Sequence, residues 1–235
     1  MNNKEYALIV AGGTGTRMNS PAPKQFMTIN GLPILMHTIN AFVRYSPTLP
    51  IILVLPEADF GTWTSLCAQF DFRHPVELQR GGTSRFQSVK NGLSKIKGEG
   101  LVAIHDGVRP LISEDIINKS FRLATTTGSA VASVMLKESI RMTDQERSTA
   151  VERSRFRLIQ TPQTFDIGLI KNAYEITEDP RLTDDASVAE RNGAIISLFE
   201  GRYDNIKITT PEDLVVAEAL MKVRAMQRTE KQKPA

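Results

Sequence analysis

The chain has 235 residues, of which 41% are hydrophobic and 23% are charged, and its formal net charge is +3 at neutral pH. These proportions are those of an ordinary globular protein and exclude a low-complexity or fibrous chain. The single cysteine, Cys67, cannot form an internal disulfide, which favours a reducing compartment. No apolar run approaches the roughly 20 residues that span a bilayer. We therefore expect a cytoplasmic protein with neither membrane nor nucleic acid as a partner, since its basic residues are spread along the chain.

Apolar runs rich in β-branched residues alternate with segments of helical periodicity along most of the chain. The expected strands are 6–11, 51–56, 76–79, 101–106, 129–136 and 194–199, and the expected helices are 33–45, 60–70, 84–96 and 114–126. This alternation predicts one α/β domain over 1–235, with a Rossmann-like, mainly parallel, doubly wound sheet. In such sheets ligands bind at the carboxyl ends of the strands.

Two regions depart from this alternation. Residues 137–160 mix charged and apolar side chains and have too few of the latter for a core, so we expect a projecting β-hairpin arm. An arm of this kind, placed at 137–157, is typically packed on a second subunit. The end of the chain predicts a short strand at "NIKIT", then a helix that begins at Pro211, and then a disordered tail at 226–235.

The stretch "LIVAGGTGTRMNSPAPKQF" (8–26) ends the first expected strand in a loop with three glycines and two cations: Gly12, Gly13, Gly15, Arg17 and Lys24. Glycines let the backbone approach a ligand closely, and backbone N–H groups in such a loop bind anions. Fixed cations beside a polyphosphate stabilise the charge that develops during phosphoryl transfer. Met18 stands where the dinucleotide-binding fingerprint needs a third glycine, and no Walker A ending follows. A bare loop of this kind is also compatible with a simple strand-to-helix turn.

This string and five later motifs resemble the 2-C-methyl-D-erythritol 4-phosphate cytidylyltransferase family. The later motifs are "GGTSRFQSVKNGL" (81–93), "HDGVRP" (105–110), "TPQTF" (161–165), "TDDAS" (183–187) and "DNIKITTPEDL" (204–214). The resemblance implies transfer of a cytidylyl group from CTP to a small polyol phosphate, with Mg²⁺ as cofactor. It also implies a homodimer formed through the arm.

The resemblance also implies roles for individual residues. Catalytic roles fall on Arg17, Lys24, Arg153 and Lys207. Nucleotide binding falls on Ala11, Gly12, Gly13, Gly15, Gly82, Ser88 and Asp106, and acceptor binding on Ser139, Arg153, Thr183 and Lys207. Ser139 and Arg153 would reach the site of the other subunit. Arg85 and Arg109 would support the site, and Asp204 would support Lys207 or contact the metal. Asp184 and Asp185 would orient Thr183 and the helix after it. Asp106 is the candidate protein ligand for an Mg²⁺ that CTP phosphates mainly hold.

Two alternative functions stay open. A ribitol-5-phosphate cytidylyltransferase shares most of these motifs, although "SVKNGL" and "TDDAS" favour the methylerythritol enzyme. A non-catalytic CTP sensor with this fold is the alternative from another class, but such a sensor could lose Lys24 and still bind CTP. The three histidines, His37, His74 and His105, are too scattered in the sequence for a metal cluster, and we expect them to be structural.

Overall fold

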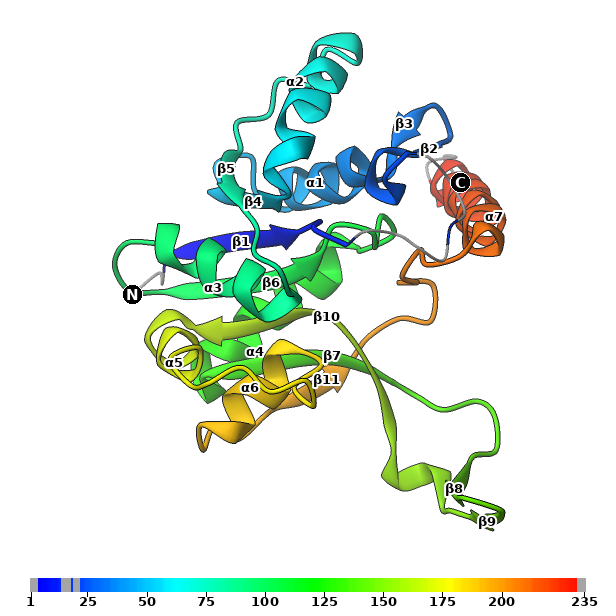
Figure 1. Cartoon of the computed structure of the whole chain (residues 1–235). Helices are drawn as coiled ribbons and strands as arrows, with labels where there is room; N and C mark the ends of the chain where they lie inside the picture. Colours follow the sequence, from blue (N-terminus) through cyan, green and yellow to red (C-terminus); the bar gives the residue numbers. More distant parts are fainter. Residues whose placement is uncertain (1–3, 14–17, 19–21, 232–235) are drawn as a thin grey trace.

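The computed structural model describes residues 4–13, Met18 and 22–231. Its centre is a seven-stranded sheet with the order β11–β7–β10–β6–β1–β4–β5 (Figure 1). Neighbouring strands run parallel except where β10 pairs, antiparallel, with β6 and β7. The predicted α/β fold with a mainly parallel sheet is therefore confirmed. No helix among the described residues combines the length and the apolar character needed to cross a membrane.

The elements follow one another in the order that the sequence predicts over the first half of the chain. The strands are β1 (Glu5–Val10), β2 (Thr28–Ile29), β3 (Leu32–Pro33), β4 (Ile51–Leu55), β5 (Glu77–Arg80), β6 (Leu101–Asp106), β7 (Ser129–Met135), β8 (Arg141–Asp144), β9 (Arg147–Ala150), β10 (Arg157–Asp166) and β11 (Leu198–Glu200). The helices are α1 (Ile34–Tyr45), α2 (Phe60–Gln69), α3 (Arg85–Lys95), α4 (Glu114–Thr127), α5 (Ile167–Ala173), α6 (Asp185–Arg191) and α7 (Pro211–Lys231).

Helices cover both faces of the sheet, so it is doubly wound as predicted. Successive residues of a strand point to opposite faces. Ala7 and Ile9 of β1 therefore pack into the cluster that α1, α2 and α4 cover, whereas Leu8 packs into the cluster beneath α3, α5 and α6. Burial on both sides explains why β1, β4 and β6 read as nearly continuous apolar runs.

A smaller apolar cluster closes the carboxyl end of the sheet. Ile208 and Ala217 of the C-terminal segment pack with Val108, which follows β6, and with Ile29. The Ile208 N–H donates to the Val108 carbonyl at 2.9 Å. This packing brings the segment before α7, residues 201–210, across the end of β6.

The C-terminal region differs from prediction in two ways. The prediction of a strand at "NIKIT" is wrong. Residues 201–210 form irregular backbone, and side-chain hydrogen bonds of Arg109 and Asn205 hold it in place. The first six residues of the expected tail at 226–235 instead continue α7, which reaches Lys231. No proline or glycine occurs in residues 212–231, so the sequence gives no signal that would end the helix earlier.

Strand β10 was not anticipated as a member of the sheet. Its sequence, "RLIQTPQTFD", is mostly polar and contains Pro162, which normally argues against a central strand. The pairing with β7 shifts register between Ile159 and Gln163, and this irregularity accommodates the proline. Helix α5, which follows directly, was missed as well.

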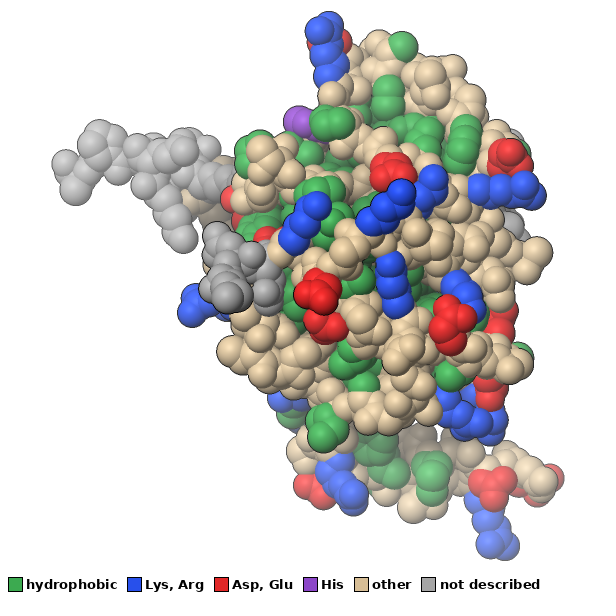
Figure 2. Space-filling view, turned by 90° about the vertical axis from the view of Figure 1, so that its left-hand side faces the viewer, with side chains coloured by type: hydrophobic (Ala, Val, Ile, Leu, Met, Phe, Trp, Pro, Cys, Tyr) green, Lys and Arg blue, Asp and Glu red, His purple; other side chains and the backbone are tan. Residues whose placement is uncertain are grey.

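The β-hairpin arm is present as predicted and projects away from the sheet (Figure 1). Its strands β8 and β9 pair only with each other, and every residue in them is exposed. Figure 2 shows basic and acidic side chains interspersed over one face of the molecule rather than gathered in a patch of one sign.

Candidate active site

Two adjoining cavities lie at the carboxyl ends of β1 and β6. The loop cavity, of about 310 Å³, is lined by the glycine loop and the segment before α3, including Ala11, Gly12, Gly13, Lys24, Gly82 and Ser88. The strand cavity, of about 520 Å³, is lined by β10 and the segment before α6, including Gln160, Thr161, Gln163, Thr183 and Asp184. Arg85, Asp106 and Lys207 line both cavities and form their shared wall.

The loop cavity lies between two glycine-containing segments that face each other. A Cβ atom built on Gly12 would lie 3.6 Å from the Ser88 hydroxyl oxygen, and one built on Gly13 would lie 3.9 Å from Cε of Lys24. The Gly82 N–H donates to the Ser88 hydroxyl at 3.0 Å, and that hydroxyl donates to the Ser84 carbonyl at 2.8 Å. Small residues on both sides leave room for a planar ligand bound largely through main-chain groups.

The segment before α3 depends on one glycine and one cap. A Cβ on Gly82 would lie only 2.2 Å from Cβ of Gln87, so no larger residue fits there without a shift of the backbone. The cap of α3 is Ser84, whose hydroxyl accepts the Gln87 N–H at 3.0 Å. Thr83, the residue before this cap, lines the loop cavity.

Asp106 is the charged centre of the shared wall. Its Oδ2 lies 3.0 Å from Nε of Arg109 and 3.1 Å from Nζ of Lys207. Burial by itself would raise the pKa of Asp106, but Lys207, Arg109 and Arg85 together hold it well below its ordinary value. The carboxylate is therefore ionised at neutral pH and fixes two cations at the boundary of the cavities.

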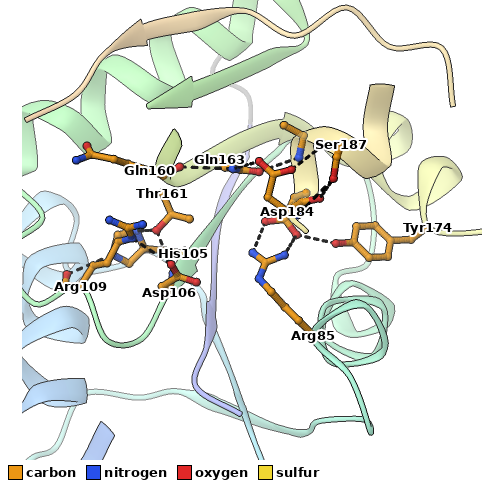
Figure 3. Close-up of polar contacts among 12 residues, drawn as sticks. Arg85, His105, Asp106, Arg109, Gln160, Thr161, Gln163, Tyr174, Asp184 and Ser187 are labelled. Atoms are coloured by element: carbon orange, nitrogen blue, oxygen red, sulfur yellow. Dashed lines mark hydrogen bonds and ion pairs between the residues drawn. The ribbon is translucent and has the colours of Figure 1, made fainter. Parts of the chain in front are cut away.

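Behind Asp106 lies a buried polar chain (Figure 3). The Asp106 N–H donates to the Thr161 hydroxyl oxygen at 3.1 Å, and that oxygen lies 3.0 Å from Nδ1 of His105. Burial lowers the pKa of His105 to about 3, so its ring is neutral. The Arg109 carbonyl faces Nε2 at 3.4 Å and can only accept, so Nδ1 accepts the Thr161 proton. His105 is structural, as expected.

Lys207 and Asp204 do not form the pair that the sequence suggested. Lys207 contacts Asp106, whereas Asp204 accepts from Nε of Arg202 and from Nε of Arg224 of α7, both at 2.9 Å. The Lys207 side chain is 39% exposed and extends from irregular backbone into the boundary between the cavities. Arg109 anchors the segment 201–210, because its Nη1 donates to the Asn205 carbonyl at 2.8 Å.

Asp184 and Asp185 have separate tasks. Asp184 caps α6 in a capping box with Ser187, and its Oδ2 accepts from Nε2 of Gln163 at 2.8 Å. This cap fixes Thr183, the preceding residue, at the edge of the strand cavity. The Asp185 carboxylate instead accepts two hydrogen bonds from Arg85 of the shared wall, at 2.6 and 2.8 Å.

Two of the remaining candidates, Ser139 and Arg153, lie apart from the cavities. Ser139 and Arg153 are exposed in the arm segment and line neither cavity of their own chain. Nη1 of Arg153 donates to the Lys137 carbonyl at 2.6 Å. Gly15 and Arg17 lie outside the described residues.

Several residues of the site were not found from the sequence. Gln160 and Gln163 line the strand cavity, and Tyr174 contacts Asp185 from α5's end. The motif "TPQTF" contains Gln163, but only the antiparallel pairing of β10 with β6 shows that this side chain faces the ligand edge of the sheet. Nothing in the local sequence marks Tyr174.

The doubly wound sheet, the glycine loop and the paired cavities with cations between them define an α/β enzyme of the nucleotidyltransferase class. A family model, described as 2-C-methyl-D-erythritol 4-phosphate cytidylyltransferase, matches residues 6–223. Two curated relatives carry the same name: one from Bacteroides fragilis, 47% identical over 92% of this chain and 98% of its own, and one from Azobacteroides pseudotrichonymphae, 46% identical over 93% and 99%.

Solved structures agree with this match. The 4-diphosphocytidyl-2C-methyl-D-erythritol synthase from Anaerococcus prevotii superimposes with a TM-score of 0.81 at 28% identity, over 94% of this chain and 96% of that one. A 2-C-methyl-D-erythritol 4-phosphate cytidylyltransferase from Thermus thermophilus gives a TM-score of 0.73 at 28% identity, over 94% and 100%. The chain belongs to the 2-C-methyl-D-erythritol 4-phosphate cytidylyltransferase family.

Proposed function

We propose that this protein transfers the cytidylyl group of CTP to 2-C-methyl-D-erythritol 4-phosphate, releasing pyrophosphate, as a step in isoprenoid precursor synthesis in the cytoplasm. The observation that supports it best is the pair of cavities with a common wall of Arg85, Asp106 and Lys207. A transfer between two phosphorylated substrates needs both of them side by side, with cations at the point where they meet. The family match supplies the identity of the substrates.

In this assignment CTP occupies the loop cavity and the acceptor occupies the strand cavity. A phosphate oxygen of the acceptor attacks the α-phosphorus of CTP, the new P–O bond forms, and the bond from the α-phosphorus to the bridging oxygen breaks. Pyrophosphate leaves with the electron pair of that bond. A phosphate monoester is already anionic near neutral pH, so the reaction needs no strong general base, and the described cavities present no Ser–His or Cys–His pair.

The cations divide between the two substrates. Lys24 lies beside Gly13 in the loop cavity, where it would stabilise the charge that grows on the leaving pyrophosphate. Arg17 is assigned the same role by resemblance alone. Lys207 lies at the boundary with the acceptor and is the cation that both phosphate groups can share.

Magnesium fits this site as a nucleotide-borne ion rather than as one held in a protein cage. No group of three or more His, Cys, Asp or Glu side chains suited to a metal occurs within the described ranges. Asp106 is the carboxylate that the two cavities share, and Mg²⁺ commonly combines one such carboxylate with substrate phosphates and water. Bound in this way, the ion would neutralise triphosphate charge during transfer.

We also propose that the protein is a homodimer in which the arm completes the neighbouring site. The arm and its base carry exposed apolar side chains, among them Met142, Phe156 and Leu158, at 64%, 44% and 53% exposure. Such side chains favour burial against a partner. In the dimer, Ser139 and Arg153 would bind the acceptor phosphate of the other subunit.

The test is pyrophosphate release from CTP and Mg²⁺, with 2-C-methyl-D-erythritol 4-phosphate and D-ribitol 5-phosphate offered in parallel. The proposal predicts strong preference for the first acceptor. Preference for ribitol phosphate would assign the protein to the other cytidylyltransferase activity. Measurable CTP binding with no release from either acceptor would favour the sensor.

A further inference from the structure

We propose that Tyr174 and Asp185 are positioning residues for the transfer, because they hold the Arg85 guanidinium in the shared wall of the two cavities. The inference rests on the proposed function, in which phosphate groups occupy both cavities. Neither Tyr174 nor Asp185 lines a cavity, so both act through Arg85. We call these three residues the arginine clamp.

Arg85 is placed to contact both substrates. It is the first residue of α3, its side chain is 30% exposed, and it lines the loop cavity as well as the strand cavity. A guanidinium has five N–H donors, and two of them are bound to Asp185. Within the described part of the chain no other hydrogen-bond partner of the Arg85 side chain is found, which leaves three donors for anions in the cavities.

Asp185 is the fixed end of the clamp. Its side chain is fully buried, and its carboxylate accepts three hydrogen bonds. Oδ1 accepts from Nη1 of Arg85 at 2.8 Å and from the Tyr174 hydroxyl at 2.6 Å, while Oδ2 accepts from Nη2 of Arg85 at 2.6 Å. The two parallel bonds from one guanidinium fix its plane as well as its position. The Arg85 fork therefore has a defined direction before any substrate arrives.

Tyr174 completes the coordination of the carboxylate. Its ring is buried and packs against Phe86, the residue after Arg85, with centroids 4.7 Å apart. Burial raises the pKa of the Tyr174 hydroxyl well above its ordinary value, so it stays protonated and donates to Asp185. Without this donor, one lone pair of a buried carboxylate would lack its partner, and Arg85 alone would hold the carboxylate in place.

The clamp joins the walls of the two cavities. Arg85 directly follows the segment 81–84 of the loop cavity, and Asp185 follows Thr183 by two residues at the edge of the strand cavity. These segments are 100 residues apart in the sequence. A clamp with defined geometry keeps the donor and acceptor sites in register, which is the form of positioning that lowers a bimolecular barrier.

Tyr174→Phe tests this role with the least disturbance, because it keeps the ring against Phe86 and removes only the hydroxyl. We expect kcat/KM to fall about three- to tenfold for both substrates, less than the full value of a hydrogen bond to a charged group, because Tyr174 acts only through Arg85. Glu175→Gln is the matched control: Glu175 is adjacent, and its exposed pair with Lys90 also joins this region to α3. The control should change kcat/KM by less than twofold.

A double-mutant cycle separates positioning from general structural support. In an Arg85→Ala background, Tyr174→Phe should reduce kcat/KM by less than twofold, because the clamp has nothing left to position. An unchanged kcat/KM in Tyr174→Phe would overturn the proposal, and so would an equal loss with and without Arg85.

If the wild-type protein releases no pyrophosphate, the proposed function fails instead. The arginine clamp is then tested by the Kd of CTP, which Tyr174→Phe should raise at least threefold. An unchanged Kd would contradict the clamp.

Discussion

The shared wall and the arm are two polar regions of the same chain that are built in opposite ways. Asp106, Arg109 and Lys207 sit at the end of a fully buried strand, and each charge has a partner within 3.1 Å. The arm has a single two-stranded hairpin whose residues are all exposed. A lone hairpin of this kind is marginally stable in water. The comparison indicates that the wall is preorganised within one chain, whereas the arm would gain a defined position from the proposed dimer.

The largest effect is expected at the wall. Lys207→Ala should reduce turnover by about 100-fold or more, because it removes a fixed cation from the place where charge develops. Steady-state pyrophosphate release measures this loss. Lys90→Ala, at an exposed lysine outside the cavities, should leave turnover within twofold of wild type. Similar rates for the two variants would mean that the wall has no special electrostatic role.

The stability of the folded protein should depend on pH through His105, which lies behind the wall. The pKa of His105 is lowered to about 3 in the fold from an ordinary 6.5, so the unfolded chain takes up the proton first as pH falls. The free energy of unfolding should therefore fall by about 2 kcal/mol between pH 7 and pH 5 and continue to fall toward pH 3. Urea denaturation across this range measures it.

His105→Gln provides the control for this prediction. This variant should lose most of the fall in the free energy of unfolding between pH 7 and pH 5. A smaller dependence on pH should remain from His37, because burial lowers its pKa as well. An unaltered slope in the variant would show that other groups dominate the pH dependence.

A smaller effect is expected at the arm, and it should depend on subunit exchange. Arg153→Ala should raise the acceptor KM about tenfold and leave the Kd of CTP unchanged, since it removes one charged contact to a phosphate. When Arg153→Ala subunits are mixed with Lys24→Ala subunits, part of the activity should return. One site of the mixed dimer then has an intact Lys24 from one subunit and an intact Arg153 from the other. No recovery after exchange would contradict a site shared between subunits.

The smallest effect is expected inside the hairpin itself. Arg141 donates to the Ser148 hydroxyl and carbonyl across β8 and β9, both at 2.9 Å, and both residues are exposed. Arg141→Ala should change the free energy of unfolding by less than about 0.5 kcal/mol. A loss above about 1.5 kcal/mol in chemical denaturation would show that the arm belongs to the cooperative core.

The same contrast explains what the sequence could predict. Alternating strand and helix patterns report local burial, so β1, β4 and β6, and hence the location of the ligand edge, were predictable. The strand β10 was not, because its polar residues and Pro162 conceal a central position that only its neighbours in the sheet determine. The hairpin was predictable because the lack of apolar residues is itself a local property.

Pairings between distant charges were beyond the sequence. Asp204 was expected to support Lys207, three residues later, but it binds Arg224 on α7. Asp185 was expected to act on its own helix, but its carboxylate turns toward Arg85 and Tyr174. Charge and spacing identify such residues as candidates, whereas the packing of α3, α5 and α6 on the sheet decides which of them meet.

In the proposed reaction, CTP and the acceptor occupy adjoining cavities together and react with each other without an enzyme-bound intermediate. Exchange of labelled pyrophosphate into CTP, measured with and without 2-C-methyl-D-erythritol 4-phosphate, tests this. We predict exchange only when the acceptor is present, since the reaction then runs in both directions through a complex of both substrates. Exchange without acceptor would demonstrate a cytidylyl–enzyme intermediate and contradict the account, as would the absence of exchange under both conditions.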